Sequence, residues 1–259
     1  MNIYDDTDIF KAYIRNVTEK DYFVDLIRSD DSLIAHIKNQ KKLLINDIGT
    51  HEGTLFLKIM SALEKVTCDK CIEVDAVEPS KPALAEFQKK NIDKYKINFF
   101  PTTYDSFTPN KNYDLTIASH CLYWSPCLKD IIVKMLNHSK FTYIIVRGKR
   151  GTHEIFSKFR HCIGNKMAQS YNAKDIEKIL EEVAGKTHSI STHNFTSELN
   201  ISYCKRPKDP EGEKLISFFL QNQYAHIPEK DKKDIHLWFD KKTDIIPNDV
   251  SVFKIVNNK

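Results

Sequence analysis

The stretch Lys42-Leu-Leu-Ile-Asn-Asp-Ile-Gly-Thr-His-Glu-Gly-Thr-Leu-Phe-Leu-Lys58 decides the fold, because it joins an apolar run to a turn with an acid and two glycines. The acid is Asp47, and the glycines are Gly49 and Gly53. Such a run indicates a buried parallel strand, and a glycine just beyond it lets a ligand approach the backbone. The stretch therefore predicts a strand, a ligand-binding turn, and a helix that begins at Gly53.

The spacing of the acid and the two glycines, Asp-x-Gly-x-x-x-Gly, indicates which ligand the turn binds. It matches the turn Asp/Glu-x-Gly-x-Gly-x-Gly that binds S-adenosylmethionine (SAM), and it differs from the Gly-x-Gly-x-x-Gly of dinucleotide enzymes. His51 stands where the middle glycine is common, so its side chain narrows the approach to the methionine part of the cofactor. An ordinary strand, turn and helix of any α/β protein is the alternative that this spacing leaves open.

Size and composition favour one mildly basic globular domain. The chain has 259 residues, 29% of them charged, with a net charge of +4. That charge is far from the basic footprint of a nucleic-acid binder. No apolar stretch approaches the roughly 18 residues of a membrane span, and the acidic N-terminus is unlike a signal peptide. We therefore expect a cytoplasmic monomer that binds a small-molecule substrate and neither nucleic acid nor a membrane.

The six cysteines are scattered, which does not suggest a disulfide framework. Cys68 and Cys71 form one Cys-x-x-Cys pair, but no second pair and no histidine pair at zinc spacing accompanies it. We therefore expect free thiols and no metal. A metal or redox role for the pair remains the alternative.

Apolar residues at helical spacing predict two helices over residues 8–28, with a helical continuation over 32–38, ahead of the first strand. Thr18 and Asp21 lie three residues apart and predict a cap for the second helix. The late segment 172–185 predicts another helix, with Asn172 at its start and Gly185 after its end.

Further apolar runs alternate with helical segments, which is typical of a doubly wound parallel sheet. The predicted strands after the first are 71–78, 97–106, 113–119, 141–147, two within 187–204, and 250–256. The predicted helices between them are 54–65, 81–91, 126–138, 213–224 and 229–240. We interpret 1–259 as a single domain composed of a helical cap (1–41), a cofactor-binding core (42–206), a helical substrate lid (207–247) and a last strand (248–259).

Polar side chains follow the predicted strands at the edge where open parallel sheets bind ligands. Glu78 ends the second strand, where a carboxylate can accept hydrogen bonds from both hydroxyls of a ribose; a solvated loop carboxylate is the alternative. Tyr104, Asp105 and Ser106 end the third strand, where a carboxylate can accept from the amino group of an adenine. Ser119 ends the fourth strand, and His120 to Trp124 follow it.

In this arrangement the chain resembles the class I SAM-dependent methyltransferases and, over nearly its whole length, the histamine N-methyltransferase family. The segments that carry the resemblance are Phe10, Thr18-Glu19, Ile48-Gly49, Gly53, Val77-Glu-Pro-Ser80, Leu122-Tyr123, Ile144-Ile-Val146, Tyr171-Asn-Ala-Lys-Asp175 and the strand Val250-Ser-Val-Phe-Lys-Ile-Val256. The resemblance implies an α/β fold with a doubly wound, seven-stranded Rossmann-like sheet, N-terminal helices and a helical insertion before the last strand.

The resemblance also implies SAM as cofactor, S-adenosylhomocysteine (SAH) as product, and a set of site residues. The implied cofactor contacts are Asp47, Gly49, His51, Gly53, Glu78, Pro79, Ser80, Tyr104, Asp105, Ser106, Ser119 and His120. The implied substrate contacts are Glu19, Tyr123 and Trp124, joined by His226, Trp238 and Phe239 if the predicted lid closes. Glu19 would anchor the amine of the substrate; a capping or solvated helix residue is the alternative.

Methyl transfer is an in-line displacement from a sulfonium, so an enzyme for it chiefly positions the acceptor and excludes water. Glu19 can orient an amine, and the ring faces of Tyr123 and Trp124 favour cationic parts of a substrate. His120 can take the proton or merely line the wall. A methyltransferase for a protein or another macromolecule, and a non-catalytic relative that binds the cofactor, remain alternatives to an amine N-methyltransferase.

Overall fold

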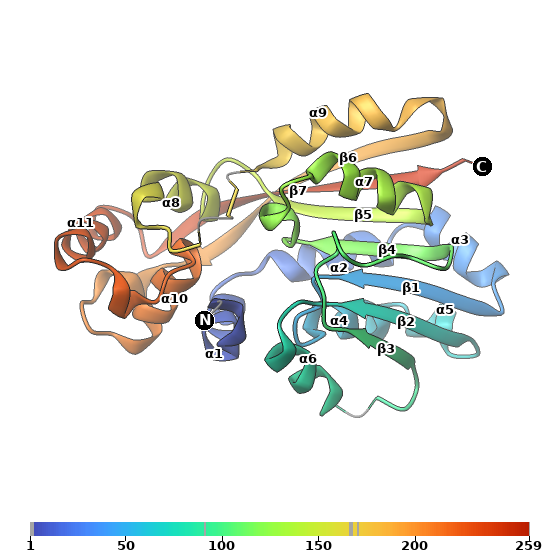
Figure 1. Ribbon diagram of the computed structural model, residues 1–259, viewed down its shortest axis with the longest axis horizontal. Helices are drawn as coiled ribbons and strands as arrows, with labels where there is room; N and C mark the ends of the chain where they lie inside the picture. The colour runs from blue at the N-terminus through green and yellow to red at the C-terminus, as the bar shows by residue number, and fades with distance from the viewer. Residues whose placement is uncertain (1–2, 91, 166–167, 170, 259) are drawn as a thin grey trace.

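The computed structural model describes residues 3–90, 92–165, 168–169 and 171–258. These residues form a seven-stranded sheet in the order β3-β2-β1-β4-β5-β7-β6 (Figure 1). The strands are β1 Lys42–Ile48, β2 Cys71–Val77, β3 Lys96–Phe100, β4 Tyr113–Ser119, β5 Ser139–Arg147, β6 His188–Asn200 and β7 Ile245–Asn257. The first five strands pair in parallel, and β7 runs antiparallel to both β5 and β6. This is the class I methyltransferase fold, which confirms the predicted fold class.

Helices cover both faces of the sheet, as a doubly wound sheet requires. They are α1 Thr7–Arg15, α2 Glu19–Arg28, α3 Asp31–Asn39, α4 Thr54–Ala62, α5 Glu64–Thr67, α6 Lys81–Gln88, α7 Leu128–Asn137, α8 Thr152–Lys158, α9 Ala173–Val183, α10 Pro210–Leu220 and α11 Glu229–Asp240. One apolar core joins α2, α3 and α4 to the sheet, and a second joins α7 and α9 to its opposite face. Successive side chains of β5 point to opposite faces of the sheet, so Tyr143 packs in the first core and Ile144 in the second.

A third apolar core forms a separate lobe, in which α8, α10 and α11 gather at one end of the sheet, with α1 beside them (Figure 1). Residues 207–247 supply α10 and α11, and Tyr13 of α1 and Phe159 after α8 complete the packing. The lobe brings the N-terminal helices and the late insertion together, so residues from both ends of the chain meet there. Within the described part of the chain, every helix is too short or too polar to cross a membrane.

Three local predictions were wrong. Strand β3 ends at Phe100 and not at residue 106, because Pro101 lacks the N–H that would continue the ladder, and the chain turns instead. Residues 188–200 form one strand rather than two, since β7 pairs along its whole length. Thr18 is the N-cap residue of α2, but its side chain forms no capping hydrogen bond, and its hydroxyl instead accepts one from the backbone N–H of Glu198 (3.0 Å). Asn172, by contrast, forms the capping box that starts α9.

Candidate functional site

A cavity of about 420 Å³ lies at the carboxyl ends of the parallel strands. Its floor comes from the turn after β1 and from the residues that follow β2, β3 and β4, and its outer wall comes from α1, α2 and α10. The volume lies in the range of about 300 to 1,000 Å³ that is typical of cofactor and small-molecule sites. Open parallel sheets bind their ligands at this edge, so the cavity is the candidate active site.

The turn after β1 depends on its glycines. Gly49 and Gly53 have φ of +68° and +72°, in the left-handed region that side chains disfavour. A Cβ on Gly49 would lie 2.3 Å from the Cβ of Cys121, and one on Gly53 would lie 2.3 Å from the ring of Phe87. Gly49 lines the cavity, whereas Gly53 precedes α4 and lies outside the lining. Gly53 therefore shapes the turn from outside the cavity lining, and its predicted contact with the cofactor stays a prediction.

His51 also has a left-handed backbone, with φ of +49°, at the position where glycine is common. Its ring lies against Phe10, with 3.9 Å between the ring centroids, and its Nε2 is 3.3 Å from the carbonyl oxygen of Tyr4. Burial lowers the pKa of His51 to about 4, so the ring is neutral and Nε2–H donates to that carbonyl. The side chain therefore ties the N-terminal segment to the edge of the cavity.

Glu78 follows β2 and is almost fully buried in the cavity wall. The backbone N–H of Ser80 donates to Oε1 (2.9 Å), and the backbone N–H of His51 donates to Oε2 (3.1 Å). Burial outweighs these bonds and raises the pKa of Glu78 to about 7. Pro79 lines the cavity as well, but Ser80 does not: its hydroxyl caps α6 and donates to the carbonyl of Tyr4.

Two groups of opposite charge face the cavity near the glycine turn. Asp47 is buried, accepts a hydrogen bond from the hydroxyl of Thr50, and has its pKa raised to about 6 by burial. Lys20, in the first turn of α2, lines the same space, and burial lowers its pKa to about 8. Among the described residues, no carboxylate oxygen lies within 4.0 Å of its Nζ. Sequence reasoning missed Lys20, although its position next to Glu19 was a usable signal.

Glu19 lines the cavity and is 3% exposed. The hydroxyl of Tyr13 donates to its Oε1 (3.0 Å), and the side-chain amide of Asn248 donates to its Oε2 (3.0 Å). The Nε2 of His120 lies 3.4 Å from the same Oε1. Because the carboxylate is held by groups from α1, β7 and the loop after β4, it is a fixed acceptor that faces the cavity. The contact of Asn248 with Glu19 could not be predicted from the sequence, because Asn248 is one polar residue of the last strand, 229 positions from Glu19.

The contacts of His120 decide its tautomer. Its Nδ1 is 3.0 Å from the hydroxyl of Tyr123, which also accepts the backbone N–H of Arg147 (2.8 Å). Burial lowers the pKa of His120, so the ring is neutral. The carboxylate of Glu19 opposite Nε2 favours the proton on Nε2, and the Tyr123 hydroxyl then donates to Nδ1. Nδ1 is thus hydrogen-bonded, whereas Nε2 lies 3.4 Å from Glu19 Oε1 and makes no hydrogen bond to the described residues. The role of His120 as proton acceptor or as wall residue stays a prediction.

The far end of the cavity is formed by the loop after β3 and by apolar residues. Tyr104 and Asp105 line it, and the hydroxyl of Ser125 donates to Asp105 Oδ1 (2.8 Å). Ser119, at the end of β4, lines it too, whereas Ser106 lies outside the lining. The predicted adenine end therefore has two of its three loop residues at the cavity wall.

The predicted aromatic wall is only partly on the main cavity. Trp124 lines it and donates through Nε1 to Gln221 Oε1 (2.9 Å). Tyr123 borders an adjoining space of about 40 Å³, together with Glu19 and Arg147. Two aromatic residues that sequence reasoning missed, Tyr4 and Phe218, border both spaces. The rings of Phe218 and Tyr13 stack at 4.1 Å between centroids, so they form one apolar surface beside Glu19.

The three residues predicted to reach the substrate from the insertion lie elsewhere. Phe239 is fully buried in the lobe's own core, and Trp238 packs edge-on against Phe159. His226 lies in a short turn with an exposed side chain. None of the three lines the cavity in the described structure. Helical periodicity does not distinguish the face that fills the lobe from the face that meets the cavity, and Phe218 of α10 occupies the latter.

Comparisons with known proteins show the fold. No protein-family model matches the chain, and no curated protein matches it. The plantazolicin methyltransferase BpumL, solved in complex with SAH, is 15% identical with a TM-score of 0.58, covering 98% of this chain and 91% of that one. The plantazolicin methyltransferase BamL matches at 15% identity and a TM-score of 0.54, with the same coverage. The cyclopropane synthase MmaA2 from Mycobacterium tuberculosis matches at 15% identity with a TM-score of 0.51, and the match covers 88% of this chain and 82% of that one.

Proposed function

We propose that this protein transfers the methyl group of SAM to a small-molecule amine. The observation that carries the proposal is the continuity of the cavity: it runs from the glycine turn and Glu78 to the buried carboxylate of Glu19. One end offers the groups that a nucleoside and an amino acid need, and the other offers a fixed anionic acceptor between aromatic rings. The SAH bound to the similar fold of BpumL supports the choice of cofactor.

The cofactor end fits SAM in its donors and in its shape. Gly49 lines the cavity, and its left-handed backbone shapes a turn whose backbone a ligand can approach from the cavity. Glu78 has both oxygens fixed by backbone N–H groups, so their remaining lone pairs can accept from ribose hydroxyls. Asp47 and Lys20 offer charges opposite to those of the ammonium and carboxylate groups of methionine. Tyr104 and Asp105 border the space for the adenine.

The substrate end favours an amine. Glu19 accepts hydrogen bonds from Tyr13 and Asn248 and still faces the cavity, so it can accept an N–H from a substrate. The stacked rings of Tyr13 and Phe218 provide an apolar surface for the carbon skeleton. Together with the resemblance to histamine N-methyltransferases, this makes a biogenic amine such as histamine the first acceptor to test.

The residues of the chain contribute position and exclusion of water. When bound, SAM would supply an activated methyl group: the lone pair of a neutral amine forms the new nitrogen–carbon bond in line as the carbon–sulfur bond breaks, and SAH leaves. Glu19 directs the lone pair by holding an N–H of the amine. The proton lost from the nitrogen passes to Glu19 or to solvent, since His120 keeps no free lone pair in the favoured tautomer. Tyr4, Phe10 and Phe218 shield this end from water.

A non-catalytic relative that binds the cofactor is the second candidate, and His51 is the observation that favours it, because its side chain occupies the glycine turn. A macromolecular substrate finds less support, since the acceptor Glu19 lies in a buried position. The test is a methyl-transfer assay with labelled SAM and a panel of amines that includes histamine. Turnover that Glu19→Gln strongly reduces supports the amine methyltransferase; tight SAM binding without turnover on the whole panel supports the second candidate.

A further inference from the structure

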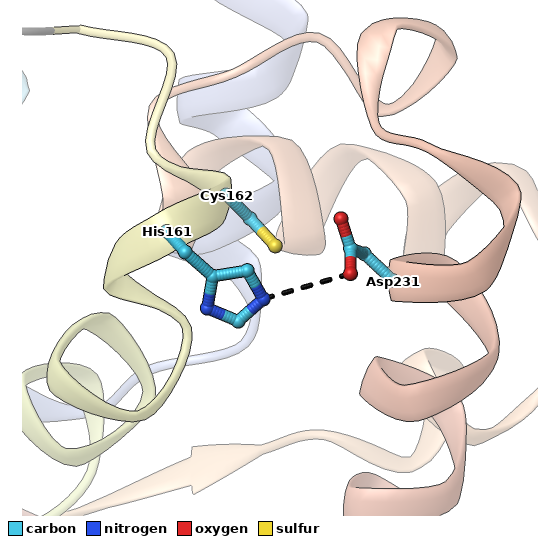
Figure 2. Close-up of side chains that lie close together, drawn as sticks. All are labelled: His161, Cys162 and Asp231. Carbon is cyan, nitrogen blue, oxygen red and sulfur yellow. Dashed lines mark ion pairs between the residues drawn. The ribbon is translucent and has the colours of Figure 1, made fainter.

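Three side chains of different donor types meet in the lobe, away from the cavity (Figure 2). His161 and Cys162 lie on the 3-10 helix η3 (Arg160–Cys162), and Asp231 lies in the first turn of α11. One donor atom from each residue lies within 4.8 Å of the other two, and His161 Nε2 is 3.6 Å from Asp231 Oδ1. Nitrogen, sulfur and carboxylate oxygen are the donors that Zn²⁺ takes in proteins.

The fold itself holds these donors together. The side-chain amide of Asn222 donates to the carbonyl of Cys162 (2.9 Å), and the backbone N–H of Gly164 donates to the carbonyl of Leu220 (3.3 Å). These bonds pin the η3 loop to the end of α10. Cys162 is buried in the third apolar core, whereas His161 is exposed, so an ion could enter from solvent. The two donors on η3 are therefore held in place, and the site is open to solvent.

The electrostatic surroundings favour a cation. Asp231 lies beside the Cys162 thiol, and Asp234 follows three residues later on the same helix. Among the described residues, neither aspartate has a lysine or arginine nitrogen within 4.0 Å, and the ion pair that Asp231 forms is with His161. A divalent cation would neutralise these carboxylates and stabilise the thiolate form of Cys162.

We propose that His161, Cys162 and Asp231 bind a divalent transition-metal ion, for which Zn²⁺ is the best match. Zinc bonds of about 2.0 to 2.3 Å in a tetrahedral site place two donors roughly 3.3 to 3.6 Å apart. The His161–Asp231 distance of 3.6 Å already fits, so only small side-chain movements are needed. Water completes the coordination, and binding releases the thiol proton of Cys162 to solvent.

The ion would link η3 to α11 as a structural site. It would take no part in methyl transfer, since the three residues lie outside the cavity lining. The loop it fixes leads to Asn165, which does line the cavity. The expectation of no metal rested on the absence of spaced Cys and His pairs. The present donors are two neighbours in sequence and an aspartate 69 positions later, a pattern that spacing rules do not detect.

Titration of the untagged, full-length protein with Co²⁺ tests the proposal, because a cobalt–thiolate bond gives a charge-transfer absorption band. The background is a Cys68→Ser/Cys71→Ser/Cys127→Ser variant, since these three thiols are exposed and can bind metal by themselves. We expect one equivalent of Co²⁺ to develop the band and Zn²⁺ to displace it. His161→Ala and Asp231→Asn should each weaken binding by about 100-fold or more.

His226→Ala is the matched control, since it removes an exposed histidine of the same lobe, and it should leave the titration unchanged. Cys162→Ser should abolish the band, but its burial can also affect folding, so His161→Ala, which changes an exposed side chain, is the deciding variant. Thermal unfolding of the background variant should shift upward with Zn²⁺, and this shift should vanish in His161→Ala. Absence of a thiolate band, or a band of equal affinity in His161→Ala, would overturn the proposal.

Discussion

Replacing Glu19 by Gln probes the substrate end of the cavity with almost no change in shape. The glutamine can still accept from Asn248 through Oε1 and can donate to the hydroxyl of Tyr13 through Nε2, so the fold should persist. What the variant loses is the negative charge and the acceptor that faces His120 and the substrate. A hydrogen bond to a charged group contributes about 1.5 to 3 kcal/mol. For the amine we therefore expect kcat/KM to fall by about 10- to 150-fold.

The assay is steady-state methyl transfer to the best amine of the panel, alongside calorimetric titration with SAM. The affinity for SAM should stay within about twofold, because Glu19 is hydrogen-bonded to Tyr13 and Asn248 and not to the residues that we assign to the cofactor. Asp21→Asn is the matched control: Asp21 lies in the same first turn of α2 but forms an exposed ion pair with Lys58, which contributes little. Unchanged kcat/KM in a folded Glu19→Gln variant would refute the role assigned to Glu19.

Three further predictions concern the cofactor turn and its charges. Gly53→Ala should lower the free energy of unfolding in urea by more than about 1 to 2 kcal/mol, because the strain of a left-handed alanine adds to a clash with Phe87. Gly185→Ala has open space around its Cβ, so it should lower that free energy by only about 1 kcal/mol. Equal losses in the two variants would contradict this prediction. Affinity for SAM should rise about tenfold from pH 6 to pH 8 as Glu78 ionises through a pKa of about 7, and Glu78→Gln should flatten this rise. His51→Gly should tighten SAM binding by calorimetry, and weaker binding would show that the imidazole supports the site.

The pKa of Glu78 also fixes the sign of a stability effect. Its folded-state value of about 7 lies above the ordinary value of 4.5, so the folded protein holds a proton that the unfolded chain releases. The contribution of Glu78 to stability is therefore fully present below pH 4.5 and is lost as the pH rises through 7. Bound SAM should offset this loss, since ribose hydroxyls favour the ionised carboxylate.

Local patterns predicted the parts of the site that follow directly from a strand. Asp47, Gly49 and Glu78 lie at strand ends, and the alternation of strands and helices is enough to bring those ends to one edge. The backbone angles of Gly49 and Gly53 agree with the glycine spacing. These features depend on residues that are close in sequence or on the parallel pairing of strands. The alternation of apolar runs and helical segments along the sequence predicts that pairing.

The parts that the sequence did not reveal depend on contacts between distant segments. Asn248 reaches Glu19 only because β7 inserts between β5 and β6. Tyr4 and Phe218 meet because the N-terminal segment and α10 pack at the same end of the sheet. Trp238 carries the same aromatic signal as Phe218 but packs inside the lobe. Residue type and helical spacing cannot decide between such faces without the tertiary arrangement.

Calorimetric titration with SAM and SAH, on the wild type and on Glu78→Ala, tests the central claim most directly. The variant removes both carboxylate oxygens from the cavity wall while Gly49 and the turn remain. We predict micromolar binding of both ligands to the wild type, and a loss of at least about 10-fold in affinity in the folded variant. Absence of binding to the wild type, or equal affinity in the two proteins, would contradict the assignment of this cavity as a SAM site.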